Sequence, residues 1–168
     1  MSRLPAGVSL RPATVADAEA AARMHLTCWR EAYGPLVEQR LLDAALSDPA
    51  AWAARWRELI ETGSRLLAVH RDEVVGFAAA GPARDLVPPA ATELHAIYLL
   101  AAWHGTGIGQ ALLDEVLGDR AAYVWVLEGN ARAQAFYARN RFRDDGGRQP
   151  CERLGAHEVR MARGSMPA

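Results

Sequence analysis

The sequence predicts one mixed α/β domain spanning residues 1–168, in which a single, mostly antiparallel twisted sheet carries helices on both faces. Three observations predict this fold class. Helical segments follow a short first strand, two apolar segments then meet at a hairpin signal, and a strand–helix–strand–helix succession comes after them. A doubly wound sheet would alternate strands and helices throughout, so this order argues against it. The chain is also long enough for one domain with a proper core.

The first strand and the first helix come at the start of the chain. Residues 8–11 are apolar enough for a short strand. Thr14, followed three residues later by Asp17, is typical of a capping box and predicts a helix start. Apolar residues then recur at helical spacing until Gly34-Pro35 ends the helix.

Two further helical segments follow. A looser one covers residues 37–46. Asp48-Pro49 then predicts the cap and first-turn proline of another helix, which stops near Gly63.

Strands come next, in the middle of the sequence. Residues 65–70 and 73–80 are rich in apolar side chains, and Arg71-Asp72 between them predicts a tight hairpin turn. Residues 83–91, which contain two consecutive prolines, predict a loop.

A strand–helix–strand–helix unit follows this loop. It consists of a strand at 92–99, a helix from 108 to 117, a strand at 123–127 and a helix to Arg139 that Asn130 is placed to cap. Segments near 151–154 and 157–161 predict two closing strands. The part of the chain that carries the motifs described below is about 65–143.

Composition excludes several classes of partner. A formal net charge of -1 gives no electrostatic reason to expect nucleic acid or an anionic membrane. No apolar run reaches the ~20 residues of a membrane span, and the N-terminus lacks the apolar region of a signal peptide, so we expect a cytoplasmic protein. Cys28 and Cys151 fit a reducing compartment. His25 with Cys28 has no second pair of ligands, so no metal is expected.

A glycine-spaced loop lies between the strand at 92–99 and the helix after it. It reads His104-Gly105-Thr106-Gly107-Ile108-Gly109. Glycines let the backbone turn tightly and approach a ligand, and the first turn of a helix leaves unpaired N–H groups in a field that favours anions. The loop therefore predicts a cradle for a pyrophosphate.

Two nucleotide-binding motifs match this loop only in part. The chain contains no lysine, so the phosphate-binding lysine of a P-loop is absent. Gly105-x-Gly107 also fits the start of a dinucleotide fingerprint, and Glu128 lies roughly 20 residues on, where that motif has a ribose-binding acid. The third glycine of the fingerprint is Gln110 here, and the loop lies far down the chain. A dinucleotide-binding oxidoreductase therefore remains an alternative.

The loop more closely resembles the cofactor motif of the GNAT superfamily of acyl-coenzyme A-dependent N-acetyltransferases. That motif is Arg/Gln-x-x-Gly-x-Gly/Ala, and His104 takes its first position here. A second segment resembles the family pattern N-x-x-A-x-x-F-Y…G-F, with Arg141 in place of the glycine. The resemblance covers nearly the whole chain and implies the GNAT fold. The residues that match the second pattern are Asn130, Ala133, Phe136, Tyr137 and Phe142.

The resemblance implies acetyl-CoA as co-substrate and a set of residues that bind it. Loop N–H groups would hold the pyrophosphate, and a bulge would separate the fourth strand from the fifth. Backbone groups of the fourth strand and the side chain of Asn130 would then bond to the pantetheine arm and the acetyl carbonyl. The cofactor-binding residues implied in this way are Ile97, Tyr98, Leu99, His104, Gly105, Thr106, Gly107, Ile108, Gly109, Asn130, Ala133 and Tyr137.

Tyr137 is the predicted general acid. A phenol with a pKa near ~10 stays protonated at neutral pH and can donate to a departing thiolate of pKa ~8.5. The alternative is that Tyr137 only packs its helix onto the sheet, although Phe136 can do that alone.

The proton acceptor has three candidates. Glu93, His95 and Ile97 share one face of their strand by alternation, and Glu93 on that face would accept the proton of the amine, directly or through water. His95, with an ordinary pKa near ~6.5, could serve instead. Glu128, just past the next strand, is the third candidate.

Aromatic residues of the first helix are candidates for the acceptor side. Trp29 and Tyr33, four residues apart, would form a wall beside the amine together with His95, or they belong to the core. The prediction is acetyl transfer from acetyl-CoA to a primary amine of an unidentified small molecule. A non-catalytic acyl-CoA-binding module is the other alternative. Dimers are common among similar proteins, so the resemblance also allows a homodimer.

Overall fold

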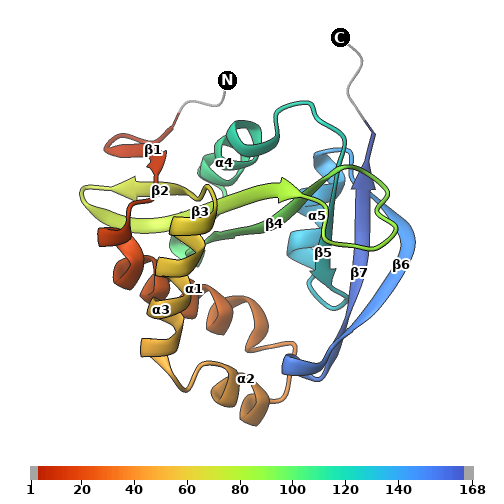
Figure 1. The fold of residues 1–168 in the computed structure, drawn as a ribbon, viewed down its shortest axis with the longest axis horizontal. Coiled ribbons are helices and arrows are strands. Elements are labelled where there is room, and N and C mark those ends of the chain that lie inside the picture. The colour runs from red at the N-terminus through yellow and green to blue at the C-terminus, as the bar shows by residue number, and fades with distance from the viewer. Residues whose placement is uncertain (1–3, 165–168) are drawn as a thin grey trace.

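A seven-stranded sheet organises the computed structural model, which describes residues 4–164 (Figure 1). The strands lie in the order β1-β2-β3-β4-β5-β7-β6, and all neighbours are antiparallel except β4 and β5. The predicted mixed, mostly antiparallel sheet is therefore confirmed. The strands are β1 (Val8–Pro12), β2 (Leu66–His70), β3 (Glu73–Pro82), β4 (Thr92–Leu99), β5 (Ala122–Leu127), β6 (Arg143–Cys151) and β7 (Ala156–Arg163).

Helices cover both faces of this sheet, as predicted (Figure 1). Helices α1 and α3 pack on one face through Leu67 and Phe77, and α4 packs on the other through Ala68 and Val75. Helix α5 shares an apolar cluster with α4, β5 and β7. No helix within residues 4–164 has the length and apolar character needed to cross a membrane. The helices are α1 (Ala18–Tyr33), α2 (Gln39–Ala45), α3 (Pro49–Thr62), α4 (Ile108–Leu117) and α5 (Ala131–Arg139).

Several turns and caps have the structure that their sequence predicts. Arg71 and Asp72 both have positive φ, 47° and 72°, as a two-residue hairpin turn requires. The side chain of Asp48 caps α3 by accepting the N–H of Ala51 at 2.9 Å. Asn130 caps α5, and its side-chain oxygen accepts a backbone N–H at 3.1 Å. These features depend on local chemistry alone, which is why the sequence predicts them.

The predicted position of the first closing strand is wrong. Strand β6 covers Arg143–Cys151, which includes the polar glycine stretch predicted as a turn, and the segment after Cys151 forms a turn of 3-10 helix, Glu152–Leu154. Since β6 lies at the edge of the sheet, most of its side chains are exposed and it lacks apolar alternation. Strand β7 contains the second predicted strand, at 157–161.

A β-bulge in β4 shapes the centre of the molecule. The register of β4 against β3 shifts at His95, which stands as an extra residue in β4. Leu94 and Ile97 consequently share one apolar cluster although they are three positions apart. The predicted common face for Glu93, His95 and Ile97 is therefore wrong, because the bulge interrupts the alternation on which it depended.

Strand β4 diverges from β5 along its length (Figure 1). The parallel register joins these strands at Glu93 and Tyr123 alone, whereas β4 pairs with β3 from Thr92 to Leu99. Beyond Glu93, every second N–H and C=O of β4 therefore faces no neighbouring strand. The separation of the fourth and fifth strands implied by the family resemblance is present.

Helix α5 ends in a Schellman motif with arginine at the position where the family pattern has glycine. The N–H of Phe142 donates to the carbonyl of Tyr137 at 3.0 Å, and the N–H of Arg141 donates to that of Ala138 at 3.2 Å. Arg141 has a φ of 67°, in the left-handed region. The rings of Tyr137 and Phe142 lie 5.7 Å apart between centroids, the apolar contact that accompanies this motif. The substitution therefore preserves the turn that fixes Tyr137 against the sheet.

Replacing Arg141 with glycine should raise the free energy of unfolding by roughly 1 kcal/mol. An L-residue in the left-handed region costs about 1–2 kcal/mol, and the greater freedom of glycine in the unfolded chain offsets part of the gain. Chemical denaturation measures the change. Arg141→Ala is the control, because alanine removes the side-chain contacts but keeps the backbone strain. A glycine variant no more stable than the alanine variant would show that the turn is unstrained.

Candidate active site

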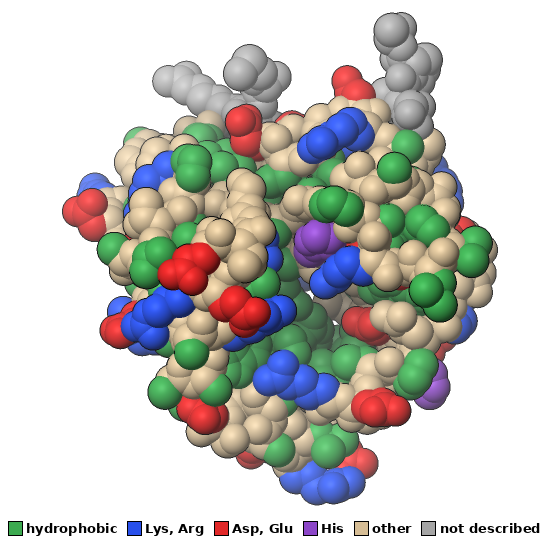
Figure 2. Space-filling view, in the orientation of Figure 1, with side chains coloured by type: hydrophobic (Ala, Val, Ile, Leu, Met, Phe, Trp, Pro, Cys, Tyr) green, Lys and Arg blue, Asp and Glu red, His purple; other side chains and the backbone are tan. Residues whose placement is uncertain are grey.

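A cleft of 1130 Å³ opens where β4 and β5 diverge. Its walls come from these two strands, from the loop at 104–110, from α5, and from parts of α1, β6 and β7. Figure 2 shows this side of the molecule hollowed near its middle, with hydrophobic side chains on the floor and charged side chains around it. The cleft brings the glycine loop and the diverging strand to one place.

The glycine loop presents a row of backbone N–H groups to the cleft. In the part of the chain that the structure describes, the N–H groups of residues 105–110 have no hydrogen-bond acceptor, whereas that of His104 donates to Ala101 at 3.1 Å. Gly105 and Gly107 have φ values of 77° and 87°, and α4 begins directly after Gly107. Unpaired amides at the start of a helix favour an anion.

A basic side chain lies beside this row of amides. Arg132, in the first turn of α5, contacts Nδ1 of His104, and Nε2 of His104 lies 2.9 Å from the carbonyl oxygen of Leu99. The space around Gly105 is open, since a Cβ there would meet nothing within 4 Å. A guanidinium next to free amides suits a phosphate group. Arg132 could not be predicted from the sequence, because an arginine one position inside a helix carries no motif of its own.

Most of the residues predicted to bind the cofactor line this cleft. Thr106 and Ile108 do not: the hydroxyl of Thr106 donates to the carbonyl of Trp103 at 2.6 Å, and the side chain of Ile108 is buried under the sheet. The backbone N–H groups of both residues, like the others of the loop, have no acceptor among the described residues. The predicted residues on the wall are Ile97, Tyr98, Leu99, His104, Gly105, Gly107, Gly109, Asn130, Ala133 and Tyr137.

Tyr137 lies between the apolar core and the cleft. Its side chain is 6% exposed and packs against the rings of Phe136 and Phe142. Burial, with a smaller contribution from Tyr98, raises the pKa of Tyr137 above its usual value. The hydroxyl is therefore a proton donor at neutral pH.

Two more phenols occupy the cleft wall. The hydroxyls of Tyr33 and Tyr98 lie 2.7 Å apart, and burial raises the pKa of both. Tyr33 therefore lies on the cleft wall, and its place beside the acceptor stays a prediction. Trp29 lies outside the wall: its indole N–H donates to Nε2 of His25 at 3.1 Å, and its ring packs edge-on against Tyr33.

Glu93 is buried at the closed end of the cleft, where β4 and β5 still pair. Its exposed fraction is 2%, and its carboxylate accepts hydrogen bonds from Nε of Arg84 at 3.1 Å, from the backbone N–H of Arg84 at 3.0 Å and from the hydroxyl of Tyr123 at 2.9 Å. Nη2 of Arg84 bonds to the other oxygen. Burial acts to raise the pKa of Glu93, but the bonds from Arg84 and Tyr123 outweigh it and lower the pKa. Both oxygens are therefore occupied, and the carboxylate is a poor proton acceptor.

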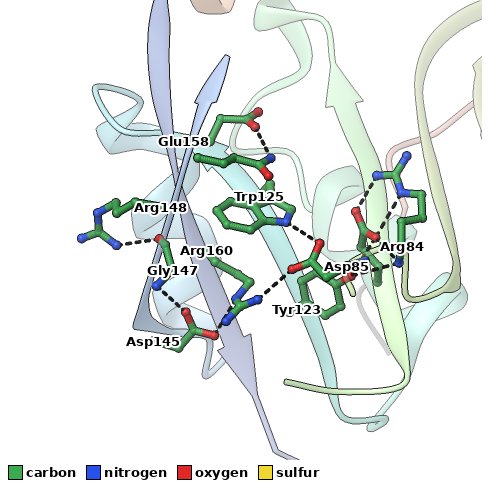
Figure 3. Close-up of polar contacts among 11 residues, drawn as sticks. Arg84, Asp85, Tyr123, Trp125, Asp145, Gly147, Arg148, Glu158 and Arg160 are labelled. Carbon is green, nitrogen blue, oxygen red and sulfur yellow. Dashed lines mark hydrogen bonds and ion pairs between the residues drawn. The ribbon is translucent and has the colours of Figure 1, made fainter. Parts of the chain in front are cut away.

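The same polar network fastens the loop after β3 to the sheet (Figure 3). Asp85 accepts the indole N–H of Trp125 at 3.0 Å and pairs with Arg160 at 2.7 Å. Arg160 also pairs with Asp145 of β6 at 2.8 Å. Residues 83–91 were predicted as a loop without any motif, so neither Arg84 nor Asp85 could be singled out from the sequence.

The other two candidate proton acceptors differ in position. His95 lines the cleft, and its Nε2 lies 3.1 Å from the carbonyl oxygen of Pro82. Burial lowers the pKa of His95. Glu128 is exposed and lies outside the wall. No group of three or more His, Cys, Asp or Glu side chains among residues 4–164 is arranged to hold a metal ion.

Two residues that no sequence motif indicates also line the cleft. They are Gln149 of β6 and Glu158 of β7, joined by a hydrogen bond of 2.7 Å. Their position depends on β7 lying between β5 and β6, which no local pattern in the sequence reveals.

The sequence matches the acetyltransferase (GNAT) family over residues 19–142. An uncharacterised N-acetyltransferase of Mycobacterium tuberculosis (strain ATCC 25618 / H37Rv) is 38% identical over 124 residues, which cover 68% of this chain and 74% of the relative. An uncharacterised N-acetyltransferase of Bacillus subtilis (strain 168) is 30% identical over 129 residues, which cover 73% of each chain.

Solved structures of low sequence identity share the fold. The PaiA N-acetyltransferase from Thermoplasma acidophilum, solved in complex with coenzyme A, superposes with a TM-score of 0.71 at 15% identity, over 95% of this chain and 99% of that one. A GCN5-related N-acetyltransferase from Rhodopseudomonas palustris gives a TM-score of 0.70 at 20% identity, over 99% and 98% of the two chains. With the family match over most of the sequence, these findings show that the chain belongs to the GNAT family of acetyltransferases and is an acyltransferase.

Proposed function

We propose that this acyltransferase transfers an acetyl group from acetyl-CoA to the primary amine of a small molecule. The observation that carries the proposal is the row of free N–H groups at 105–110, which lies on the same cleft as the buried phenol of Tyr137. An anion site and a proton donor within one cleft are what transfer from a diphosphate-bearing thioester requires.

The chain offers suitable groups for the diphosphate and for the pantetheine arm of acetyl-CoA. The amides of 105–110 and the guanidinium of Arg132 are donors for the diphosphate. Beyond Glu93, the free backbone groups of β4 can bond to the amide-rich pantetheine arm. The oxygen of Asn130 caps α5, which leaves its side-chain NH₂ for the arm. When bound, acetyl-CoA would supply the acetyl thioester.

Tyr137 is the residue that we propose as general acid. Transfer forms a bond from the amine nitrogen to the acetyl carbon and breaks the carbon–sulfur bond. An acceptor that starts as an ammonium ion loses two protons, of which one is needed by the thiol and one leaves to solvent. Tyr137 would donate its hydroxyl proton to the sulfur and then regain a proton that the amine loses. Burial keeps the hydroxyl protonated, so it is available as the donor.

We propose a structural role for Glu93 in place of proton acceptance. Its carboxylate connects Arg84 of the loop to Tyr123 of β5 and so holds the loop against the closed end of the cleft. His95 and water remain the groups that can accept the proton of the amine. Of these, His95 lies on the wall itself.

Replacing Glu93 with glutamine should lower stability more than activity. The glutamine NH₂ faces donors from Arg84 or Tyr123, and a buried donor without an acceptor costs about 1–3 kcal/mol. We expect the free energy of unfolding to fall by that amount, and kcat to fall by less than roughly tenfold with the same pH dependence. Denaturant unfolding and CoA release between pH 6 and 9 would measure both. A loss of more than ~100-fold in kcat without loss of stability would restore Glu93 as the proton acceptor.

A CoA-release assay with a panel of amines tests the proposed function. Release that depends on an added amine supports transfer, and binding of acetyl-CoA without release for any amine favours the non-catalytic module. Calorimetry with NAD tests the oxidoreductase, against which the mostly antiparallel sheet already argues.

Two further expectations belong to this proposal. Cys28 and Cys151 are free thiols, which suits the cytoplasmic location that we propose. A homodimer stays a prediction, and light scattering after size-exclusion chromatography tests it.

A further inference from the structure

The cleft is lined by side chains from both faces of the sheet. Along β5, Val126 belongs to the apolar cluster with α4 and α5, whereas Leu127 packs with α1 and α2. Strand side chains alternate, so Trp125 shares the face of Leu127. Both Val126 and Trp125 line the cleft. Since the glycine loop begins α4 on the first face, the second face is left for the acceptor.

Glu158 stands out among the carboxylates near this second face. Within residues 4–164 no Arg or His lies within ion-pair distance of it, and its side-chain partner is the amide of Gln149 at 2.7 Å. A carboxylate can accept several hydrogen bonds, so Glu158 has room for a charged donor. The neighbouring carboxylates already have cations: Glu93 pairs with Arg84, and Asp85 and Asp145 pair with Arg160 (Figure 3).

The surroundings of Glu158 favour a cation. Two ionisable groups that interact with it are the phenol of Tyr33 on α1 and the thiol of Cys151 on β6. Burial raises the pKa of both, so both are neutral at pH 7. Trp125 on the neighbouring strand lies near the carboxylate (Figure 3). The guanidinium of Arg160 lies 5.4 Å from the centroid of the Trp125 ring, and its charge is already paired with Asp85 and Asp145. A half-buried carboxylate without an ion-pair partner attracts a positive charge.

Tyr33 lies near enough to both this carboxylate and the proposed general acid for each to influence its pKa. Its hydroxyl bonds to that of Tyr98 and also interacts electrostatically with Tyr137 and Glu158. Glu31, another carboxylate on the wall, accepts the N–H of Ala101 at 2.8 Å beyond the end of β4 and lies apart from this group.

We propose that Glu158 binds the ammonium group of the acceptor, so that the enzyme selects alkyl amines, which are cationic at neutral pH, over neutral aryl amines. This inference rests on the proposed function, because it assigns the acceptor of the same reaction. Gln149 acts as a positioning residue that holds the carboxylate in place. The nitrogen then enters from the face opposite the diphosphate.

A cation that can bind but cannot be acetylated tests this proposal without depending on turnover. The full chain, in the presence of coenzyme A, is titrated with N,N-dimethylbenzylamine, a tertiary amine that is protonated at pH 7. The indole N–H resonance of Trp125, assigned with Trp125→Phe, reports binding by NMR. We expect a saturable shift for the wild type and a Kd about tenfold or more higher for Glu158→Gln, which keeps the shape but removes the charge.

Matched controls separate charge recognition from general damage. Neutral benzyl alcohol should bind the wild type and Glu158→Gln equally. Glu128→Gln removes an exposed carboxylate outside the cleft and should leave the Kd of the amine unchanged. Glu158→Ala serves as the second neutral variant if the glutamine variant does not fold. An unchanged Kd in the folded Glu158 variant, or no shift of the Trp125 resonance in the wild type, overturns the proposal, whatever the CoA-release assay shows.

Discussion

Replacing Gly107 with valine should abolish the binding of acetyl-CoA. Gly107 has a φ of 87° immediately before α4, a conformation that a β-branched residue strongly disfavours. The loop must then change conformation, and its N–H groups lose their common direction. Hydrogen bonds to a charged group contribute about 1.5–3 kcal/mol each, so loss of two weakens binding by roughly 100-fold or more. Titration calorimetry with acetyl-CoA measures the effect.

Gly146 provides the matched control for this substitution. It has a φ of 89° in β6, outside the cleft wall, and a Cβ there would meet nothing within 4 Å. Gly146→Val therefore carries a similar backbone strain but should leave the affinity for acetyl-CoA as in the wild type. If Gly107→Val and the wild type bind acetyl-CoA with equal affinity, the prediction that this loop binds the diphosphate is wrong.

Replacing Tyr137 with phenylalanine should lower kcat by roughly 100-fold or more while the Kd for acetyl-CoA stays the same. Phenylalanine keeps the ring that packs against Phe136 and Phe142, and it removes the hydroxyl that would protonate the sulfur. CoA release at saturating substrates gives kcat, and calorimetry gives the Kd.

Tyr98 offers a control for the loss of a buried hydroxyl. Its phenol also lines the cleft but bonds to Tyr33, so Tyr98→Phe should affect kcat much less than Tyr137→Phe does. If the two variants lose the same activity, the effect is not specific to the proposed acid. If kcat and affinity fall together in Tyr137→Phe, Tyr137 is a binding residue.

The parts of the fold that depend on short stretches of sequence could be predicted. The hairpin turn at Arg71-Asp72, the caps at Asp48 and Asn130 and the loop at 104–109 each follow from neighbouring residues. The sheet class followed from the order of these elements, because antiparallel hairpins and one strand–helix–strand unit together require a mixed sheet.

The parts that depend on partners distant in sequence could not be predicted. Alternation along β4 suggested a common face for Glu93 and His95, but the bulge is visible only in the register with β3. Likewise, the sequence predicts Glu93 as a proton acceptor because nothing in it indicates that Arg84, in a loop without a motif, contacts the carboxylate.

Edge position explains the misplaced closing strand and the missed acceptor residues. Strand β6 is exposed along most of its length, so its polar sequence resembles a turn. Gln149 and Glu158 come together at the cleft only because β7 lies between β5 and β6, which the sequence does not indicate.

The position of the cofactor's diphosphate in a crystal grown with coenzyme A tests the central claim most directly. We predict phosphate oxygens within about 2.7–3.2 Å of the backbone nitrogens of residues 105–110. A diphosphate bound elsewhere, with these amides bonded to the protein's own groups, would contradict it.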